Sequence, residues 1–540
     1  MSQNLSPSWL SILPPLNDEF IKNNYPSNLK LLQVHIYHRH GERAPIGSIF
    51  ESIAPKSWDF CEKANLYHYQ FRETMRKTLG TYHDANVTPV DLINKNEAVP
   101  SSFYKDARAE RIFPLNLSLK KQTGAGGNIS HKRNDPSSSY YKLATTKTCG
   151  WGQLSDAGWA SMKRVGSHFR ELYIERLGVL PTKRSDLDNS SLYVRTTDYS
   201  RTLESVSQVL SGLYPILGNK NTESAAPSYK QIPIFVRTTH GENMFFNYNC
   251  KSIIKLMKEM SKVSSEIFSS EIKELETELF SLSSIGEESR KTVESSNTIV
   301  PMHRIFDTLI AMKAHGIKLP SDITSDFIDK LGKYAVIKWF FGGVIERELQ
   351  ILQISPLSFE IANHIIYKVC EDSGQTSGIK TLPYEKSPKM MISSGHDTTI
   401  EPILFLLGYH NPDRSSDYKS YNIEWPDFGS AISLELFKGP KYQQSTKEER
   451  NESIKQINST EMWPKTIRSD VDIGEYYIRA IYNGKALKIP SCQSKGNHLE
   501  GDSSSICTLE AFLRQIGPLV VSPREYKERC KSDMRNKPQE

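Results

Sequence analysis

One short stretch of this chain constrains its fold and its chemistry more than any other. Residues 31–45, LLQVHIYHRHGERAP, begin with an apolar run of the kind that forms a buried strand. The run ends in the letters RHGER, where Gly41 allows the backbone to turn sharply. The sequence therefore predicts that His40 lies at the end of a core strand, between Arg39 and Arg43.

The residue types in this stretch suit phosphoryl transfer. Arginine side chains match phosphate oxygens bidentately and keep their charge at any working pH. A neutral imidazole nitrogen is a nucleophile that can form a covalent intermediate. A bare Arg-His-Gly tripeptide is more often a turn with solvated charges, so the specificity lies in the longer pattern R-H-G-x-R-x-P. From the residues alone, His40 is the candidate nucleophile of a phosphoryl-transfer site.

The longer pattern resembles the signature of the histidine acid phosphatases. This clade of the histidine phosphatase superfamily includes prostatic and lysosomal acid phosphatases and fungal phytases. The resemblance covers most of residues 31–530. It implies an α/β fold, a three-layer sandwich with a mainly parallel central sheet, and a mostly helical cap domain beside it.

The resemblance also implies how the 540 residues divide into domains, and a chain of this length is expected to form more than one. Residues 1–28 are predicted to form an N-terminal arm. The phosphatase domain is predicted to be discontinuous, from 28–245 and 375–540, with the helical cap at 246–374. Polar stretches near 116–144 and 440–470 are predicted to be flexible insertions in that domain.

A second stretch that bears on the site is LYVRTTDYSRTLE, at 192–204. Its first residues look like a strand, and Arg195 stands at the carboxyl end, where open α/β sheets bind ligands. A lone arginine there is usually a surface charge. Here the context is similar to the family motif Y-x-R-S/T-T-D-x-x-R-T, and the resemblance maps the third phosphate-binding arginine onto Arg195. Arg201 is expected to support the site from behind, paired with Asp198.

The other half of the expected site lies about 350 residues downstream. Residues 389–397, KMMISSGHD, predict a buried strand, a turn at Gly395 and the start of a helix. This stretch resembles the second signature of the family. A leaving alkoxide needs a proton, which Asp397 could donate as a carboxylic acid. His396 is expected to hold a phosphoryl oxygen as the imidazolium, and the requirement for a protonated Asp397 predicts an acidic pH optimum.

The sequence thus predicts an acid phosphatase that works through a phosphohistidine intermediate. His40 and Asp397 are the catalytic candidates. The phosphate-binding candidates are Arg39, Arg43, Arg195 and His396. No metal or other cofactor is expected, because the arginines take the charge-neutralising role. The flanking arginines also disfavour a metal site built from His35, His38 and His40.

Three alternatives stay open at this stage. A phytase, or inositol-polyphosphate phosphatase, would use the same chemistry and would need a strongly basic cleft. A phosphoglycerate-type mutase is disfavoured by the His-Asp pair and the long cap. A catalytically inactive phosphate-binding relative is disfavoured because every expected catalytic residue is present.

The charge and hydropathy of the chain limit its partners. The net charge of +6 suits a small anionic phosphate monoester, but the charge is spread along the chain and gives no indication of nucleic-acid binding. No window approaches 18 apolar residues, so no transmembrane segment is expected. The sequence leaves open whether the chain forms a homodimer, and it indicates no surface for the interface.

The compartment is predicted from conflicting signals. The first residues, MSQNLSPSWLSILPPLNDEF, lack a basic region and do not support secretion, so we expect an intracellular location in the cytoplasm or the mitochondrion. In secreted relatives, however, cysteines at positions like Cys492 and Cys507, and like Cys250 and Cys530, form disulfides. The sequence leaves open whether these pairs are oxidised here.

Overall fold

The computed structural model of this chain describes thirteen stretches of the sequence. They are residues 8–47, 49–50, 52–66, 147–188, 190–215, 232–237, 241–296, 302–374, 386–411, 416–421, 424–442, 473–501 and 504–531. The predicted insertion at 116–144 lies outside the described residues, as does most of the one at 440–470. Within the described stretches, no helix has both the length and the apolar character that crossing a membrane requires.

An eight-stranded sheet forms the centre of the molecule, and the strands predicted from the motifs lie in its middle. β1 (Lys30–Arg39) pairs in parallel with β4 (Met390–Gly395), and β4 pairs in parallel with β2 (Leu192–Thr196). The sheet runs in the order β3-β2-β4-β1-β5-β6-β7, with β8 beside β6. The remaining strands are β3 (Phe235–Val236), β5 (Ala431–Lys438), β6 (Tyr476–Tyr482), β7 (Lys485–Ala486) and β8 (Ile506–Thr508).

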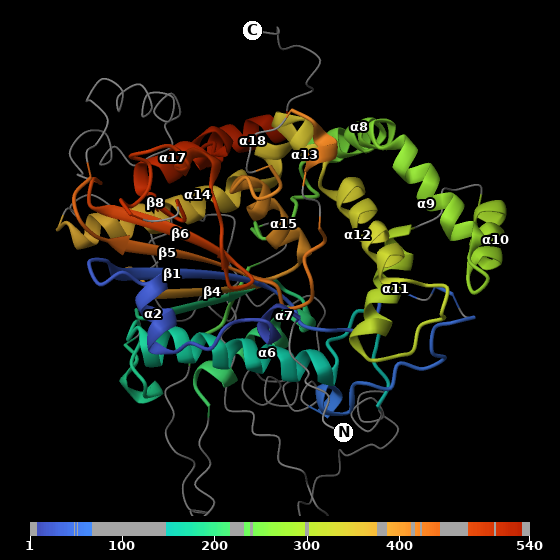
Figure 1. The fold of residues 1–540 in the computed structure, drawn as a ribbon, viewed down its shortest axis with the longest axis horizontal. Helices are drawn as coiled ribbons and strands as arrows, with labels where there is room; N and C mark the ends of the chain where they lie inside the picture. The colour runs from blue at the N-terminus through green and yellow to red at the C-terminus, as the bar shows by residue number, and fades with distance from the viewer. Residues whose placement is uncertain are drawn as a thin grey trace, which may run out of the picture.

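Helices cover both faces of this sheet, which explains why β1 and β4 are buried along most of their length. α6 (Asp156–Phe169) and α7 (Ser200–Leu213) lie on one face (Figure 1). Three helices lie on the other face, namely α14 (Arg347–Asp372), α15 (Asp397–Leu406) and α17 (Leu509–Ile516). The three-layer α/β architecture predicted from the sequence is confirmed.

Helix α6 begins after the N-cap residue Ser155, and it lies very close to the RHGER loop. The Ser155 side chain accepts a hydrogen bond from the backbone N–H of Gly158. A Cβ at Gly158 would lie 2.2 Å from the backbone oxygen of Glu42, so only glycine permits this approach. The segment around Ser155 therefore supports the motif loop by packing.

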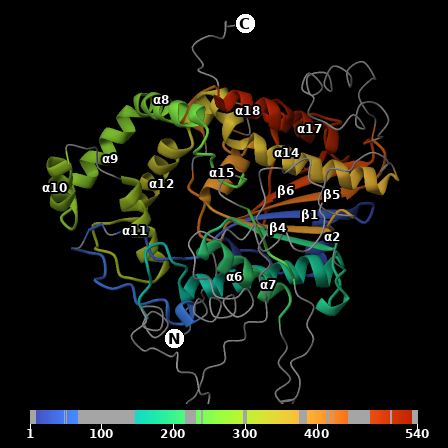
Figure 2. The same cartoon turned by 180° about the vertical axis from the view of Figure 1, so that it is seen from behind.

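A second group of helices lies to one side of the sheet (Figures 1 and 2). It contains α8 (Lys251–Ile267), α9 (Ser269–Ser281), α10 (Gly286–Ser296), α11 (Met302–Ala314), α12 (Ser325–Trp339) and α13 (Gly342–Ile345). Residues of α9, α11 and α12 share a hydrophobic core of their own. Helix α14 falls in the range predicted for the cap, but Ile361 and Ile365 pack into the core that covers the sheet.

The two ends of the described chain are packed onto the body of the protein. The N-terminal segment holds α1 (Ser8–Ser11) and α2 (Asp18–Asn24), and the indole N–H of Trp9 donates to the backbone oxygen of Gly429 at 3.1 Å. α18 (Pro523–Lys531) ends the described chain near α8 and α14. Shorter turns of helix are Arg170–Arg176, Arg184–Asp186, Tyr418–Ser420, Pro490–Cys492 and Gly517–Leu519.

Three disulfides are present, and two of them join the pairs that the family resemblance suggested. These are Cys492–Cys507 and Cys250–Cys530, and the latter ties the start of α8 to α18. The third, Cys61–Cys149, was not anticipated from the sequence. Each bond closes a loop of the unfolded chain and so reduces its conformational entropy.

Two histidines of β1 make the stability of the fold depend on pH. Burial lowers the pKa of His35 to about 3 and that of His38 to about 4. Below pH 6.5 these two imidazoles bind protons in the unfolded chain but stay neutral in the folded protein. The free energy of unfolding is therefore highest above that pH and decreases as the pH falls. We expect each to contribute a loss of about 1 to 2 kcal/mol between pH 7 and pH 5.

The measurement is urea unfolding at the two pH values, for the parent chain and for His38→Gln. The variant should lose about 1 to 2 kcal/mol less than the parent between pH 7 and pH 5. The comparison uses only the difference between the two pH values, so a general loss of stability in the variant does not affect it. An identical difference in both proteins would contradict this account of His38.

Candidate active site

His40 directly follows the carboxyl end of β1 and is almost completely buried, with 1% of its surface exposed. Its backbone N–H donates to the oxygen of Gly395 at 3.0 Å, which joins the two sequence motifs. Its ring Nδ1 lies 2.9 Å from the backbone oxygen of Gly41. Since a carbonyl oxygen can only accept, Nδ1 carries the proton and the lone pair lies on Nε2. In this tautomer Nε2 is the ring atom with the electron pair that a nucleophile needs.

The surroundings of His40 keep its imidazole neutral. Burial lowers its pKa well below the ordinary value, and the charges of Arg201, Arg39 and Arg43 lower it further. A neutral imidazole has the free electron pair that a nucleophile needs. The site therefore retains a neutral His40 in acidic solution.

The two arginines of the RHGER motif are both buried, and each is paired with a carboxylate. Arg39 Nη2 lies 2.9 Å from Asp397 Oδ2, so the first motif contacts the candidate proton donor of the second. Arg43 Nη2 lies 2.7 Å from Asp307 Oδ1 on helix α11. The ring of Phe428 lies under the guanidinium of Arg39, 4.5 Å from its centre. Held in this way, the two side chains can bind an anion without a large rearrangement.

His396 faces His40 across the site, with 5.7 Å between their ring centres. Its Nε2 lies 2.9 Å from the hydroxyl of Thr197, and its Nδ1 lies 3.4 Å from Arg201 Nη2. Burial lowers its pKa well below the ordinary value, and Arg201, Arg39 and Arg43 lower it further. These surroundings disfavour the imidazolium form that was expected of His396.

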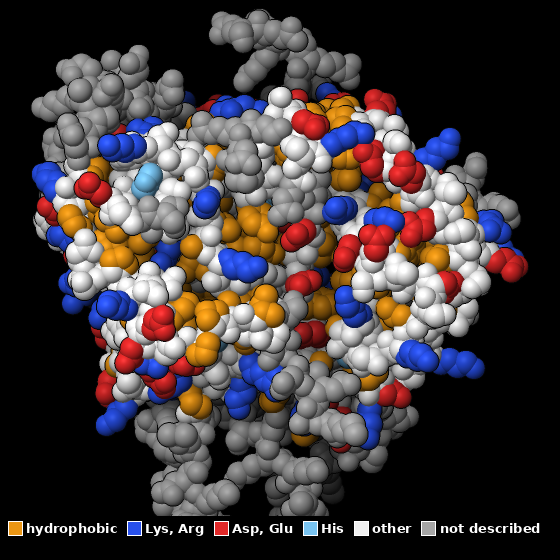
Figure 3. Space-filling model, viewed as in Figure 1, with side chains coloured by type: hydrophobic (Ala, Val, Ile, Leu, Met, Phe, Trp, Pro, Cys, Tyr) orange, Lys and Arg blue, Asp and Glu red, His pale blue; other side chains and the backbone are white. Residues whose placement is uncertain are grey.

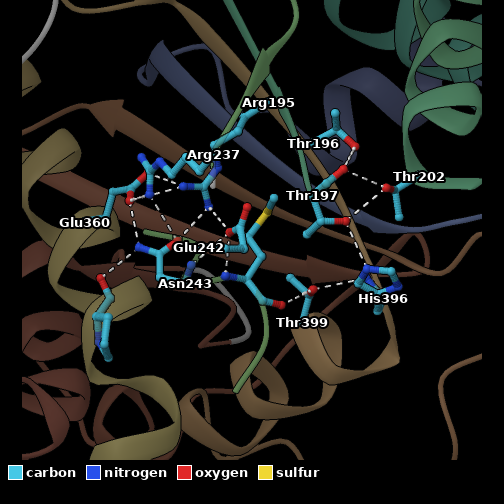
Figure 4. Close-up of polar contacts among 12 residues, drawn as sticks. Arg195, Thr196, Thr197, Thr202, Arg237, Glu242, Asn243, Glu360, His396 and Thr399 are labelled. Atoms are coloured by element: carbon cyan, nitrogen blue, oxygen red, sulfur yellow. Dashed lines mark hydrogen bonds and ion pairs between the residues drawn. The ribbon is translucent and has the colours of Figure 1, made fainter. Parts of the chain in front are cut away.

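Arg195 does not lie with the other candidate phosphate ligands, and this corrects the expectation from the sequence. Its guanidinium is 1% exposed and turned toward α14, where Nη1 lies 3.3 Å from Glu360 Oε1. Nη2 donates to Asn243 Oδ1 at 2.8 Å and lies 3.7 Å from Glu242 Oε1 (Figure 4). Arg195 is thus engaged on three sides, by two buried carboxylates and the half-buried amide of Asn243.

The position expected of Arg195 is taken by Arg201, in the first turn of α7. Its charge acts on both His40 and His396, and the neighbouring charge of Arg43 together with burial lowers its own pKa to about 10. Sequence reasoning assigned Arg201 a supporting role. The signal that could have revealed it is the second arginine of RTTDYSRT, because that residue opens a helix whose N-terminus faces the strand ends.

A chain of polar contacts joins the Arg195 cluster to His396 (Figure 4). Glu242 Oε1 accepts hydrogen bonds from the backbone N–H groups of Asn243 and Met244, both at 2.8 Å. The backbone oxygen of Met244 in turn accepts from the hydroxyl of Thr399, and that hydroxyl oxygen accepts from the backbone N–H of His396. The Arg195 cluster therefore helps to position His396 without touching it.

Within the part of the chain that the structure describes, no group of three His, Cys, Asp or Glu side chains is arranged to hold a metal ion. His35 shows why the histidines of β1 do not cluster: its Nε2 lies 2.8 Å from Gln33 Oε1, two residues back along the strand. The arrangement around His40 is instead one of converging cations, which suits an oxyanion ligand.

Comparison with known proteins finds similarity along most of the chain. Residues 30–483 match the model of the histidine phosphatase superfamily (branch 2). A probable acid phosphatase of Schizosaccharomyces pombe is 24% identical over 526 residues, which cover 94% of this chain and 95% of that protein. Human prostatic acid phosphatase is 22% identical over 71% of this chain and 80% of its own. Among solved structures, the apo form of Hafnia alvei phytase is 15% identical, with a TM-score of 0.45 over 94% of this chain and 100% of its own.

Replacement of the two arginines of RTTDYSRT should affect the stability of the fold to different extents. Arg195→Ala takes from buried Glu360 one of its two arginine partners and leaves buried Glu242 with backbone N–H donors, and we expect it to lower the free energy of unfolding by about 2 to 3 kcal/mol. Arg201→Ala is the matched control. It relieves repulsion with Arg43, so its free energy of unfolding should stay within about 1 kcal/mol of the parent.

Urea unfolding of the two variants and the parent measures both effects. A loss of stability in Arg201→Ala as large as that in Arg195→Ala would contradict the separation of the two side chains into a structural and a ligand-facing role.

Proposed function

The chain belongs to branch 2 of the histidine phosphatase superfamily and is a phosphatase; we propose that it hydrolyses phosphate monoesters through a phosphohistidine at His40. The observation that carries this proposal is the convergence of Arg39, Arg43, Arg201 and His396 on the neutral imidazole of His40. Such a set of preorganised donors stabilises the charge that develops on a transferring phosphoryl group. In this proposal Arg201 takes the ligand role that the sequence assigned to Arg195.

In the first proposed step, His40 Nε2 attacks phosphorus in line with the leaving oxygen. A P–N bond forms while the bond from phosphorus to the alcohol oxygen breaks. Asp397 transfers its proton to that oxygen, so the alcohol leaves as a neutral molecule. Arg39 holds Asp397 at 2.9 Å and could position the acid beside the leaving group.

In the second proposed step, water attacks the phosphohistidine. Asp397, now a carboxylate, accepts a proton from this water, and the P–N bond breaks to release inorganic phosphate. His40 returns to its neutral form with the proton still on Nδ1, which donates a hydrogen bond to the backbone oxygen of Gly41. Atoms and charges balance over the two steps without an additional reactant.

The proposal predicts activity on the acidic side of neutrality. A carboxylic acid must be protonated to act as the donor in the first step, and the protonated fraction of a carboxylic acid increases as the pH falls. The nucleophile does not oppose this trend, because the lowered pKa of His40 keeps the imidazole neutral in acid. The two requirements therefore overlap at mildly acidic pH.

Hydrolysis of 4-nitrophenyl phosphate between pH 4 and pH 8, with EDTA present, tests the assignment of the nucleophile. The parent chain should be active with an acidic optimum. His40→Ala should lose about 1,000-fold or more in kcat, since the covalent step cannot occur. Arg201→Ala should lose about 100-fold in kcat/KM, the scale expected for one charge-stabilising donor.

Circular dichroism of each variant provides the folding control. A folded His40→Ala protein with parent-like activity would exclude the phosphohistidine mechanism. A folded parent without activity on any ester would exclude the enzymatic proposal altogether.

The role of Asp397 is tested by the quality of the leaving group. 4-Nitrophenolate is a good leaving group that needs no proton, whereas an aliphatic alkoxide must be protonated as it leaves. Asp397→Asn should therefore lower kcat by about 10-fold for 4-nitrophenyl phosphate and by about 1,000-fold for butyl phosphate. Equal losses on the two esters would mean that Asp397 binds or positions the phosphate and does not donate the proton.

A further inference from the structure

Large hydrophobic side chains are exposed directly beside the buried catalytic groups. Tyr199 is 47% exposed, Tyr248 is 52% exposed and Ile46 is 63% exposed, whereas His40 is 1% exposed. Exposed hydrophobic groups that gather at one place in a folded protein usually mark a binding surface. Their position at this site needs an explanation that the phosphate chemistry does not supply.

The ring of Tyr199 begins this surface at the catalytic centre itself. It meets the ring of His396 edge-on, with 4.9 Å between their centres, and the guanidinium of Arg201 lies over it at 4.6 Å. Phe245 continues the surface, 6.2 Å from Tyr199 and 6.3 Å from His396. Two aromatic rings therefore border the position where a leaving group would emerge.

Tyr248 and Ile46 extend the same surface outward. Tyr248 follows Phe245 by three residues in the same loop, and its partial burial, with Tyr199 and Asp397 nearby, raises the pKa of its phenol. On the other side, a Cβ at Gly152 would lie 3.9 Å from Ile46 and 3.7 Å from Arg201. We call Ile46, Tyr199, Phe245 and Tyr248 the apolar rim.

The surface view agrees with this placement. Figure 3 shows a hollow between the sheet and helices α11 and α12, with hydrophobic side chains on its walls. The rim residues come from the loops that follow β1, β2 and β3, at the carboxyl edge of the sheet. An apolar group attached to a bound phosphate could lie along these walls.

We infer that the apolar rim binds the leaving group of the substrate, and that this group is an extended apolar chain, so that the substrate is a single-chain alkyl or acyl phosphate monoester. This inference rests on the proposed function, because it needs the phosphate at His40. It adds a substrate class that follows from the residues around the site and not from its catalytic groups.

The balance of charge supports a single phosphate on the substrate. Arg43 is already paired with Asp307, and Arg39 with Asp397. The cations near His40 thus match one phosphoryl group. A second phosphate at the rim would meet aromatic rings and the carboxylate of Asp307, which is an unfavourable environment for an anion.

The length of the rim favours a chain over a single aromatic ring. The ring centre of Tyr199 lies 4.9 Å from that of His396 and 6.2 Å from that of Phe245, and Tyr248 follows Phe245 by three residues in the same loop. One phenyl group would contact only the first of these rings, while an extended chain of about eight carbons spans roughly 10 Å and reaches beyond it. Burial of each further methylene would then strengthen binding.

The test compares kcat/KM for butyl, hexyl and octyl phosphate at concentrations below aggregation, measured as release of inorganic phosphate. These esters have nearly the same chemical reactivity, so chain length changes mainly their binding. Complete burial would give about a fourfold gain per methylene. Because the rim stays partly exposed, we expect about twofold per methylene, or roughly tenfold or more from butyl to octyl.

The double variant Ile46→Ser with Tyr248→Ser should reduce that gain to about threefold or less, while butyl phosphate hydrolysis stays near the parent value. Neither side chain binds the phosphate in the proposed mechanism. Ile254→Ser is the matched control, because Ile254 is also exposed, at 46%, but lies on the helix α8 outside the rim. This control should keep the full gain with chain length.

Several outcomes would overturn the inference. Equal kcat/KM for butyl and octyl phosphate would overturn it and leave the proposed function intact. The same would follow if inositol hexakisphosphate were a better substrate than octyl phosphate, or if the double variant impaired 4-nitrophenyl phosphate as much as octyl phosphate. Phosphate release from none of these esters, with His40→Ala indistinguishable from the parent, would overturn the proposed function itself.

Discussion

The parallel pairing of β1 with β4 is the interaction on which the site depends. The register places Arg39 opposite Gly395, and the backbone N–H of His40 donates to the oxygen of Gly395 just beyond the paired strands. Two motifs about 350 residues apart therefore end at the same edge of the sheet. A slip of one residue would turn every side chain of one strand to the opposite face, and Arg39 could then no longer reach Asp397. The apolar layers on both faces of the sheet exclude that slip, so the core of the protein sets the geometry of its chemistry.

A second, buried layer of ion pairs supports this edge from behind. Burial alone would favour a protonated Glu360, yet Arg195 and Arg237 hold its pKa well below the ordinary value. The carboxylate they stabilise belongs to α14, so the network joins that helix to β2 and to the loop that follows β3. Through Met244 and Thr399 the same loop reaches His396. The polar groups in this layer are costly to bury, and their arrangement explains how a neutral His396 is held in one orientation.

The sequence predicts well the features that follow from the order of residues along one helix or strand. It predicts less well the direction in which a side chain points, because that depends on packing. The strands that end in RHGER and in SSGHD follow from local patterns and the α/β class from the family resemblance, and the structure confirms both. Arg195 and Arg201 are six residues apart in one motif, and only the packing of α14 decides which of them faces the site. The partner of Arg43 could not be foreseen, because Asp307 lies 264 residues away on a helix whose amphipathic pattern shows nothing about its neighbours. The lowered pKa of His396 likewise depends on burial and on nearby arginines that the sequence alone does not place.

The contact between Arg43 and Asp307 shows how the helical part and the catalytic part depend on each other. Arg39, Arg43 and Arg201 repel one another in a buried space, and the carboxylates of Asp397 and Asp307 offset that repulsion when no substrate is present. Asp307 also accepts from the backbone N–H of Ile46, so the same side chain orients an arginine of the motif and the first residue of the apolar rim. In the proposed mechanism an entering phosphate would share Arg43 with Asp307, and the inferred place of its leaving group is beside Ile46. Through Asp307, helix α11 thus contacts both the arginine proposed to bind the phosphate and the segment proposed to contact the leaving group, so a substitution on α11 could alter both interactions.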